Sequence, residues 1–224
     1  MAPTELLATL DVECRLAIGV VAGLADADFN RPTRCPPWDV RVLVGHMVRD
    51  LDRMLSYLDE PAPDAAMTDA ITYFRSYDPR AEGASITASS IETADRYGSP
   101  AALVQGLDET LRRCVDRAGA EDPGRILRTR LTTIRLDEFL KTRILEIGVH
   151  GLDLADALGR DPWLTGPAAV VILEILRGLL GDDPSVSLGW SDLVFIETGT
   201  GRRALSDGER TFLGSRANAF PLLG

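Results

Sequence analysis

The sequence predicts a mainly α protein, with a bundle of long helices over residues 1–165 and a small α/β subdomain over residues 166–224. Two observations predict the bundle. Apolar residues recur at helical spacing in several long segments, and runs rich in proline, glycine and small polar residues separate those segments. A third observation predicts short strands near the C-terminus, because apolar and polar residues alternate there.

The first helix is expected from Thr4, as its cap, to about Leu24, and the run DADFNRPTRCPP ends it. A second helix is expected from Trp38 or Asp39 to about Leu58. Aliphatic residues at helical spacing would form its buried stripe: Val40, Leu43, Val44, Met47, Leu51, Met54, Leu55 and Leu58.

Residues 60–98 carry weaker signals. PAPDAAMTDA predicts a loop that leads into a short helix, and SYDPRAEGAS predicts another break. A third long helix is expected from Ser99 to Ala118, with Ser99 as the cap and Pro100 in the first turn.

The turn EDPG and a short extended piece, RILRTRLTT, lead into a fourth long helix, expected over residues 134–158 and ended by Gly159. A fifth helix is expected over residues 167–180. In the tail, SVSLGW and LVFIET predict one or two short strands, and GTGRRALSDGER predicts a turn before a last short helix.

The composition disfavours several classes of protein. There are 24 Lys and Arg against 34 Asp and Glu, a formal charge of −10, and an acidic surface repels both nucleic-acid phosphates and anionic membranes. The first residues carry acids where a secretion signal carries bases. The most apolar stretch, PAAVVILEILRGLLG, is too short to span a membrane and contains Glu174 and Arg177. We therefore expect a cytoplasmic protein that binds neither nucleic acid nor membranes.

The cysteines Cys14, Cys35 and Cys114 are odd in number and lack C-x-x-C spacing, which indicates reduced thiols rather than a disulfide framework. Each is expected to be a small buried apolar residue. The alternative for Cys35, in the loop before the second helix, is a place near a functional site.

The two histidines of the chain suggest a metal site. Glu146 precedes His150 by four residues, so on a helix the two side chains lie on one face, one turn apart. If the second and fourth helices pack together, His46 completes a set of two imidazoles and one carboxylate, which is typical of a catalytic zinc with open positions. A solvated Glu–His pair and a hydrogen-bonded core histidine are the alternatives.

Two segments resemble a known family. CPPWDVRVLVGHMVRDL is similar to the first signature of the mycothiol-dependent maleylpyruvate isomerase family, and RLDEFLKTRILEIGVHGLDLADALG is similar to its second, E-x-x-V-H-x-x-D-L. GRRALSDGERTFLGSRANAFPLLG resembles the ending of many short members. The resemblance implies a DinB-like four-helix bundle in which His46, Glu146 and His150 hold a metal, usually zinc. It also implies mycothiol, the low-molecular-weight thiol of actinobacteria, as co-substrate.

The resemblance also implies supporting residues. Asp153 matches the family's aspartate and would accept the free ring N–H of a ligand histidine; a plain helix-surface acid is the alternative. Arg143 would orient Glu146 or meet an anionic substrate, with an intrahelical ion pair as the alternative. Trp38 and Asp39 match too, and we expect structural roles: Asp39 caps the second helix and Trp38 packs beneath the site.

The leading hypothesis for function is a metal-dependent, mycothiol-using transferase or cis–trans isomerase in which a metal-bound thiolate attacks a small electrophile. A thiol with a pKa near ~8.5 is mostly protonated at neutral pH, and coordination removes that proton. One alternative is a metal-dependent hydrolase that activates water, although no carboxylate stands out as its base. Another is a non-catalytic metal-binding module.

Isomerases of the family have a C-terminal domain that helps to form the thiol and substrate pocket, and here only residues 166–224 follow the bundle. The resemblance thus implies the metal centre but leaves the electrophile open. The sequence also leaves both a monomer and a homodimer open.

Overall fold

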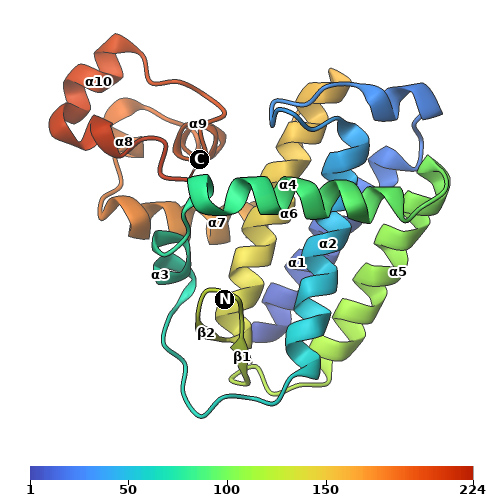
Figure 1. Ribbon diagram of the computed structural model, residues 1–224. Coiled ribbons are helices and arrows are strands. Elements are labelled where there is room, and N and C mark those ends of the chain that lie inside the picture. Colours follow the sequence, from blue (N-terminus) through green and yellow to red (C-terminus); the bar gives the residue numbers. More distant parts are fainter. Residues whose placement is uncertain (224) are drawn as a thin grey trace.

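Four long helices lie side by side and form the body of the protein (Figure 1). The computed structural model describes residues 1–223, apart from the side chain of Pro79. The four helices are α1 (Pro3–Val21), α2 (Val40–Asp59), α5 (Pro100–Gly119) and α6 (Leu136–Leu158). α1 and α2 each pack against both α5 and α6, so the helices close into a ring around a common core. The predicted helical bundle is confirmed, and α2 lies beside α6.

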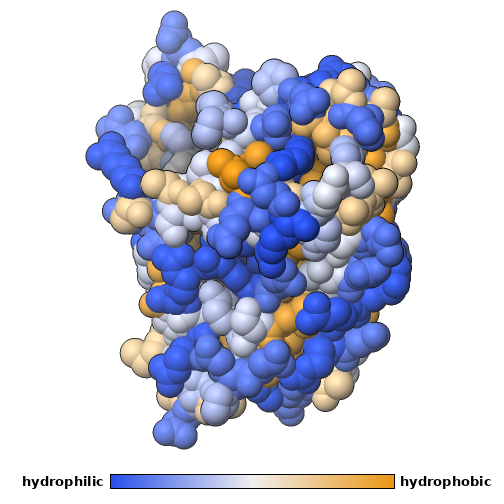
Figure 2. All heavy atoms as spheres, turned by 45° about the vertical axis from the view of Figure 1, so that its right-hand side comes forward, coloured by the Kyte–Doolittle hydropathy of each residue, from blue (hydrophilic) through white to orange (hydrophobic). Residues whose placement is uncertain are grey.

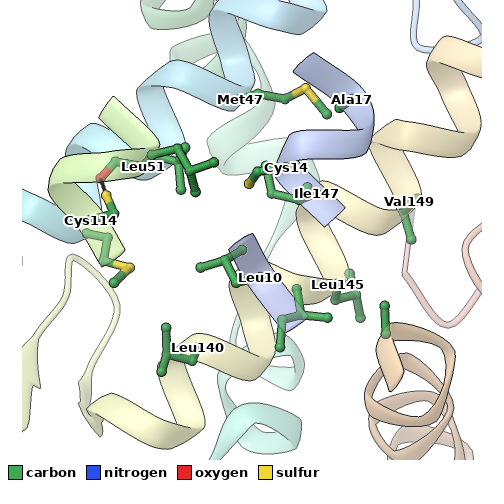
Figure 3. Close-up of a cluster of buried hydrophobic side chains, with 14 of the residues drawn as sticks. Leu10, Cys14, Ala17, Met47, Leu51, Cys114, Leu140, Leu145, Ile147 and Val149 are labelled. Atoms are coloured by element: carbon green, nitrogen blue, oxygen red, sulfur yellow. Dashed lines mark hydrogen bonds between the residues drawn. The ribbon is translucent and has the colours of Figure 1, made fainter. Parts of the chain in front are cut away.

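Aliphatic and sulfur-containing side chains from all four helices meet in the core (Figure 3). Cys14 and Cys114 lie within it and are free thiols, as expected. Burial raises the pKa of both thiols, that of Cys114 to about 12. Cys114 donates a hydrogen bond to the backbone carbonyl of Leu51 at 3.2 Å. Both residues therefore act as small apolar core residues.

Local signals fix the ends of the helices. Asp39 and Ser99 cap α2 and α5, each accepting a hydrogen bond from the backbone N–H three residues on, at 2.8 and 3.2 Å. Gly159 ends α6 in the left-handed conformation, with φ of 64°. In contrast, α1 begins at Pro3, so Thr4 lies inside its first turn and is not its cap. A short 3₁₀ helix, Asp26–Asn30, lies between α1 and α2.

The extended piece before α6 forms a hairpin, in which β1 (Ile126–Arg128) pairs antiparallel with β2 (Thr133–Arg135). Because β2 occupies residues 133–135, α6 begins at Leu136 rather than at residue 134. The short helix expected after PAPDAAMTDA is present as α3 (Ala70–Arg75).

The break expected at SYDPRAEGAS is wrong, because most of that segment lies in helix α4 (Pro79–Asp95). The segment is rich in small and polar residues, so it shows no apolar stripe, yet Asp78 caps it and a proline occupies its first turn. α4 crosses the bundle and packs on α2 (Figure 1). The approach is close at Gly45, where a Cβ atom would lie 2.7 Å from Cβ of Ala94. Packing on α2, and not an apolar pattern of its own, stabilises this helix.

The expected α/β subdomain is also wrong, because residues 166–223 contain helices and no strand. They form α7 (Gly166–Leu180), α8 (Ser185–Leu188), α9 (Asp192–Gly199), α10 (Asp207–Leu213) and a 3₁₀ helix, Gly214–Ala219. SVSLGW contains α8, and LVFIET lies in α9. Six alternating residues suit a strand or a short helix equally well, and here a cap and tertiary packing select the helix. Ser191 caps α9, which buries Phe195 and Ile196 as it packs on α7.

Helices α7 and α9 contribute to the same apolar cluster as the bundle. The domain boundary at residue 165 stays a prediction. Hydrophilic side chains cover most of the face shown in Figure 2, with small apolar patches between them. Among residues 1–223, no helix is both long and apolar enough to cross a membrane.

Candidate metal centre

His46, Glu146 and His150 converge between α2 and α6. The Oε2 atom of Glu146 lies 3.8 Å from Nε2 of His46 and 3.6 Å from Nε2 of His150. The centroids of the two imidazole rings are 4.8 Å apart. One ligand atom from each of the three residues lies within 4.8 Å of the other two. The structure thus brings together the three residues that the sequence analysis selected, through the packing of α2 on α6 that it required.

Each histidine uses its Nδ1 atom for a contact outside this cluster. Nδ1 of His150 lies 2.9 Å from Oδ2 of Asp153, and because an ionised carboxylate only accepts, Nδ1 donates. Nδ1 of His46 lies 3.1 Å from the Ser90 hydroxyl. That hydroxyl donates its proton to the carbonyl of Ile86 at 2.8 Å, so its oxygen accepts from His46. Both Nε2 atoms therefore face Glu146, and Nε2 of His46 also lies 3.7 Å from Oδ2 of Asp50.

The arrangement fits a divalent metal ion. Nε2 of His46 is buried and has no hydrogen-bond partner among the described residues, which is costly unless another group binds it. Two ligand atoms bound to one tetrahedral zinc ion lie about 3.4 Å apart, close to the separations between Glu146 and the two rings. Histidines that bind metals also commonly donate their second ring N–H to an oxygen, as both rings do here.

The charges of the cluster also suit a cation. Burial by itself would raise the pKa of Glu146, but its contacts with His150 and His46 and the charge of Arg143 hold the pKa well below its usual range. Burial would lower the pKa of His150, but its contacts with Asp153, Cys35 and Glu146 raise it well above its usual range. The carboxylate is thus ionised, and a divalent cation competes with a proton for the His150 ring.

Asp153 is completely buried, which corrects the alternative of a helix-surface acid. Besides His150, its oxygens contact Arg34 at 2.9 Å, Arg202 at 2.7 and 3.0 Å, and the thiol of Cys35 at 3.1 Å. Burial would raise the pKa of this carboxyl, but the hydrogen bonds from His150 and Arg202 hold it well below its usual range. Cys35 therefore lies beside the site, as the alternative for that residue anticipated.

Arg143 is buried and forms its ion pair across helices, not within α6. Its Nη1 atom lies 2.7 Å from Oδ2 of Asp50 on α2, and its guanidinium lies 4.8 Å from the centre of the Phe139 ring. Asp50 also accepts from Arg49 at 2.9 Å. These contacts link α2 to α6 beside the cluster, because the same Oδ2 atom of Asp50 lies 3.7 Å from Nε2 of His46.

Trp38 packs against both histidines, with ring centroids 4.7 Å from His46 and 6.0 Å from His150. Its indole N–H donates to the hydroxyl of Thr87 on α4 at 3.1 Å. The positions of Trp38 and Asp39 agree with the structural roles expected for them: one covers the site and the other caps α2.

Ser90, Arg34 and Arg202 also belong to the site, although no sequence pattern predicted them. Ser90 is on α4, a helix that was not predicted. The two arginines are 119 and 49 residues away from Asp153 in the chain, and no spacing rule connects residues so far apart. The only signal for them was indirect, because a buried aspartate needs cationic partners.

A cavity of about 360 Å³ opens from the cluster. His46, Glu146 and His150 lie on its wall, and its remaining lining is mainly aromatic and cationic: Tyr57, Tyr73, Phe74, Tyr77, Phe139, Arg49, Arg53 and Arg130. The C-terminal segment, residues 166–223, which is also called the tail below, supplies Thr200, Arg202 and Leu223. This segment therefore contributes to the pocket.

Comparison with known proteins places the chain in a family. No curated protein and no solved structure gave a significant match. The family model of the mycothiol maleylpyruvate isomerase N-terminal domain matches residues 10–155, more than half of the chain, and the matched region contains His46, Glu146 and His150. The chain therefore belongs to the mycothiol maleylpyruvate isomerase N-terminal domain family.

Proposed function

We propose that this protein is a metal-dependent enzyme, with zinc as its metal, in which a low-molecular-weight thiol attacks a small electrophile and is either transferred to it or released again after isomerisation. Mycothiol is the thiol, and the reaction is transfer or cis–trans isomerisation. One observation carries the proposal: two imidazole Nε2 atoms and the carboxylate of Glu146 converge on the wall of a cavity large enough for a small substrate. Membership of a family named for a mycothiol-dependent isomerase supports the choice of thiol.

The residues around the candidate metal site have different roles in this proposal. His46, Glu146 and His150 would hold the ion, which acidifies a thiol when one is bound to it. Ser90 and Asp153 orient the two rings by accepting their Nδ1 protons. Trp38 packs against both histidines and covers them on that side. The aromatic wall of the cavity offers apolar surface to the electrophile.

The alternative of a hydrolase needs a carboxylate that is free to take a proton from water. Among the described residues that line the cavity, the carboxylates are Asp50, Glu82 and Glu146. Asp50 is paired with Arg49 and Arg143, Glu82 with Arg130, and Glu146 faces the histidines. Because each of the three is engaged, the cavity favours thiol chemistry over water activation.

Metal analysis tests the site. The wild-type protein, purified with zinc present, should retain about one divalent ion per chain, and His46→Ala should lose it. Asp156→Asn is the matched control, because Asp156 is an exposed acid on the same helix as Glu146. Full retention of zinc by His46→Ala would overturn the ligand assignment.

Turnover tests the chemistry. The zinc-loaded protein is incubated with mycothiol and a panel of electrophiles, and products are identified by mass spectrometry. Thiol adducts or isomerised products, absent with His46→Ala, are expected. Hydrolysis products without thiol adducts would favour the hydrolase, and bound metal without any turnover would favour a binding module.

A further inference from the structure

Arg202 connects the C-terminal segment to the metal centre. It lies outside the region that the family model matches. Its Nε atom donates to Oδ1 of Asp153 at 3.0 Å and its Nη2 atom donates to Oδ2 at 2.7 Å, a two-bond fork. Its Nη1 atom donates to the carbonyl of Thr200 at 2.6 Å. The guanidinium is thus fixed both to its own turn and to Asp153.

Asp153 in turn forms a hydrogen bond with His150, one of the three candidate metal ligands. The same Oδ2 atom that accepts from Arg202 also accepts from Nδ1 of His150 at 2.9 Å. Arg34 contacts the other oxygen, Oδ1, at 2.9 Å. Of the two arginines, only Arg202 therefore bonds to the oxygen that holds the imidazole. A carboxylate bound by a fork at both oxygens cannot rotate without breaking one of these bonds.

Two other arginines, Arg34 and Arg203, lie near Arg202 and form different contacts. Arg34 also reaches Glu197 of α9 at 3.3 Å, which joins the loop before α2 to the same tail. Arg203, the next residue, points elsewhere and donates to Thr198 at 3.1 Å and Glu209 at 2.8 Å. Arg202 thus binds Asp153 at the site, whereas the neighbouring Arg203 binds two residues of the C-terminal segment.

We propose that Arg202 is a positioning residue for His150, acting through Asp153, and that the C-terminal segment is thereby an integral part of the metal centre. The inference rests on the proposed metal site. Residues that fix a ligand's partner commonly change metal affinity by about 10–100-fold. Without the fork, Arg34 still bonds to Oδ1 of Asp153, but only the Cys35 thiol and His150 itself remain on Oδ2, so the oxygen that accepts from His150 is held less firmly.

The test compares Arg202→Ala and Arg202→Lys with Arg203→Ala in the full-length protein. Zinc affinity is measured by competition with a chelator, and the visible spectrum of the cobalt-substituted protein reports ligand geometry. Arg202→Ala should bind zinc about tenfold or more weakly, with an altered cobalt spectrum. Arg203→Ala should match the wild type in both. Wild-type affinity and spectrum in Arg202→Ala would overturn the proposal.

The lysine variant keeps the charge and can bond to one oxygen only, so it should recover part of the affinity. If Arg202→Ala does not fold, Arg202→Lys carries the test, and wild-type affinity in that variant would contradict a role for the fork.

A metal-free measurement separates this inference from the proposed function. The chain has two histidines, so nitrogen-15 spectra of its imidazoles are simple, and His46→Ala assigns them. Arg202→Ala should shift the His150 ring signals, whereas Arg203→Ala should leave them in place. If the wild type binds no zinc but this difference appears, the proposed function fails and the positioning role stands. If Arg202→Ala leaves the ring signals unchanged, the positioning role fails.

Discussion

Nε2 of His46 on α2 lies 3.8 Å from Oε2 of Glu146 on α6, and no described residue forms a hydrogen bond with that nitrogen. A buried ring nitrogen without a partner lowers the stability of the folded state. A bound ion would satisfy it and would also join two helices that lie far apart in the sequence. The stability of the bundle should therefore depend on metal.

Metal removal should lower the melting temperature of the wild-type protein. An ion that binds only the native state stabilises it by about 4 kcal/mol when free zinc is about 1,000 times Kd. Thermal unfolding with added zinc and with a chelator measures the difference. Glu146→Gln should melt at one temperature under both conditions, and an equal response in that variant would contradict binding at this site.

Replacing Ser90, which accepts from Nδ1 of His46, should lower both the stability of the protein and its affinity for zinc. Ser90→Ala leaves the Nδ1–H of His46 without its acceptor, which costs about 1–3 kcal/mol in the free energy of unfolding. We also expect about tenfold weaker zinc binding, because the ring is no longer held. Urea unfolding and chelator competition measure the two effects. Ser85→Ala, at an exposed position of α4, is the control, and the prediction is wrong if both variants behave alike.

Adding one methyl group at Gly45 should disturb the packing of α4 on α2. In Gly45→Ala the new Cβ would lie 2.7 Å from Cβ of Ala94 and 2.8 Å from the carbonyl oxygen of Ser90. α4 must then move away, at a cost of about 1–3 kcal/mol in the free energy of unfolding. Urea unfolding measures it.

The matched control for that change is Gly83→Ala on α4, where an added Cβ meets nothing within 4 Å. Because alanine favours a helix over glycine, this variant should gain about 0.5–1 kcal/mol. A loss of stability in both variants would show that the close approach at Gly45 is not the cause.

Glu209 should make the tail sensitive to acid. Its carboxylate accepts hydrogen bonds from Arg203 at 2.8 Å and from the Trp190 indole at 2.6 Å. The bond from Arg203, with further bonds from Ser206 and Trp190, lowers the pKa of Glu209 to about 2. A carboxyl whose pKa is lowered by folding stabilises the protein above its unfolded pKa, and this stabilisation is lost as the pH falls towards the folded value.

The stabilisation should therefore be complete at neutral pH and disappear between pH values of about 4.5 and about 2. Glu209→Gln should be less stable than the wild type at neutral pH and equal to it near the lower limit. Urea unfolding across this range measures the difference. A gap between the two proteins that does not change with pH would contradict the assignment.

Local spacing was sufficient for the main helices and for the pair Glu146 and His150, whereas His46 was added because it is the other histidine of the chain and lies in a segment that resembles a family signature. The stripe of α2 and the separation of Glu146 from His150 each report one face of a helix, and that geometry depends only on neighbouring residues. The same reasoning failed where local signals were short or absent. It missed α4, whose small polar residues give no stripe, and it assigned strands to a tail segment that folds as α9.

The sequence by itself thus determined the helical bundle and the chemical identity of the cluster formed by His46, Glu146 and His150. Only the tertiary structure decided what holds those side chains in place. Ser90 lies 44 residues from His46, and Arg202 lies 49 residues from Asp153. Helical periodicity relates residues a few positions apart, whereas these contacts exist only because α4 packs on α2, α7 packs on α6 and α9 packs on α7. The orientation of both imidazoles is therefore a property of the folded chain.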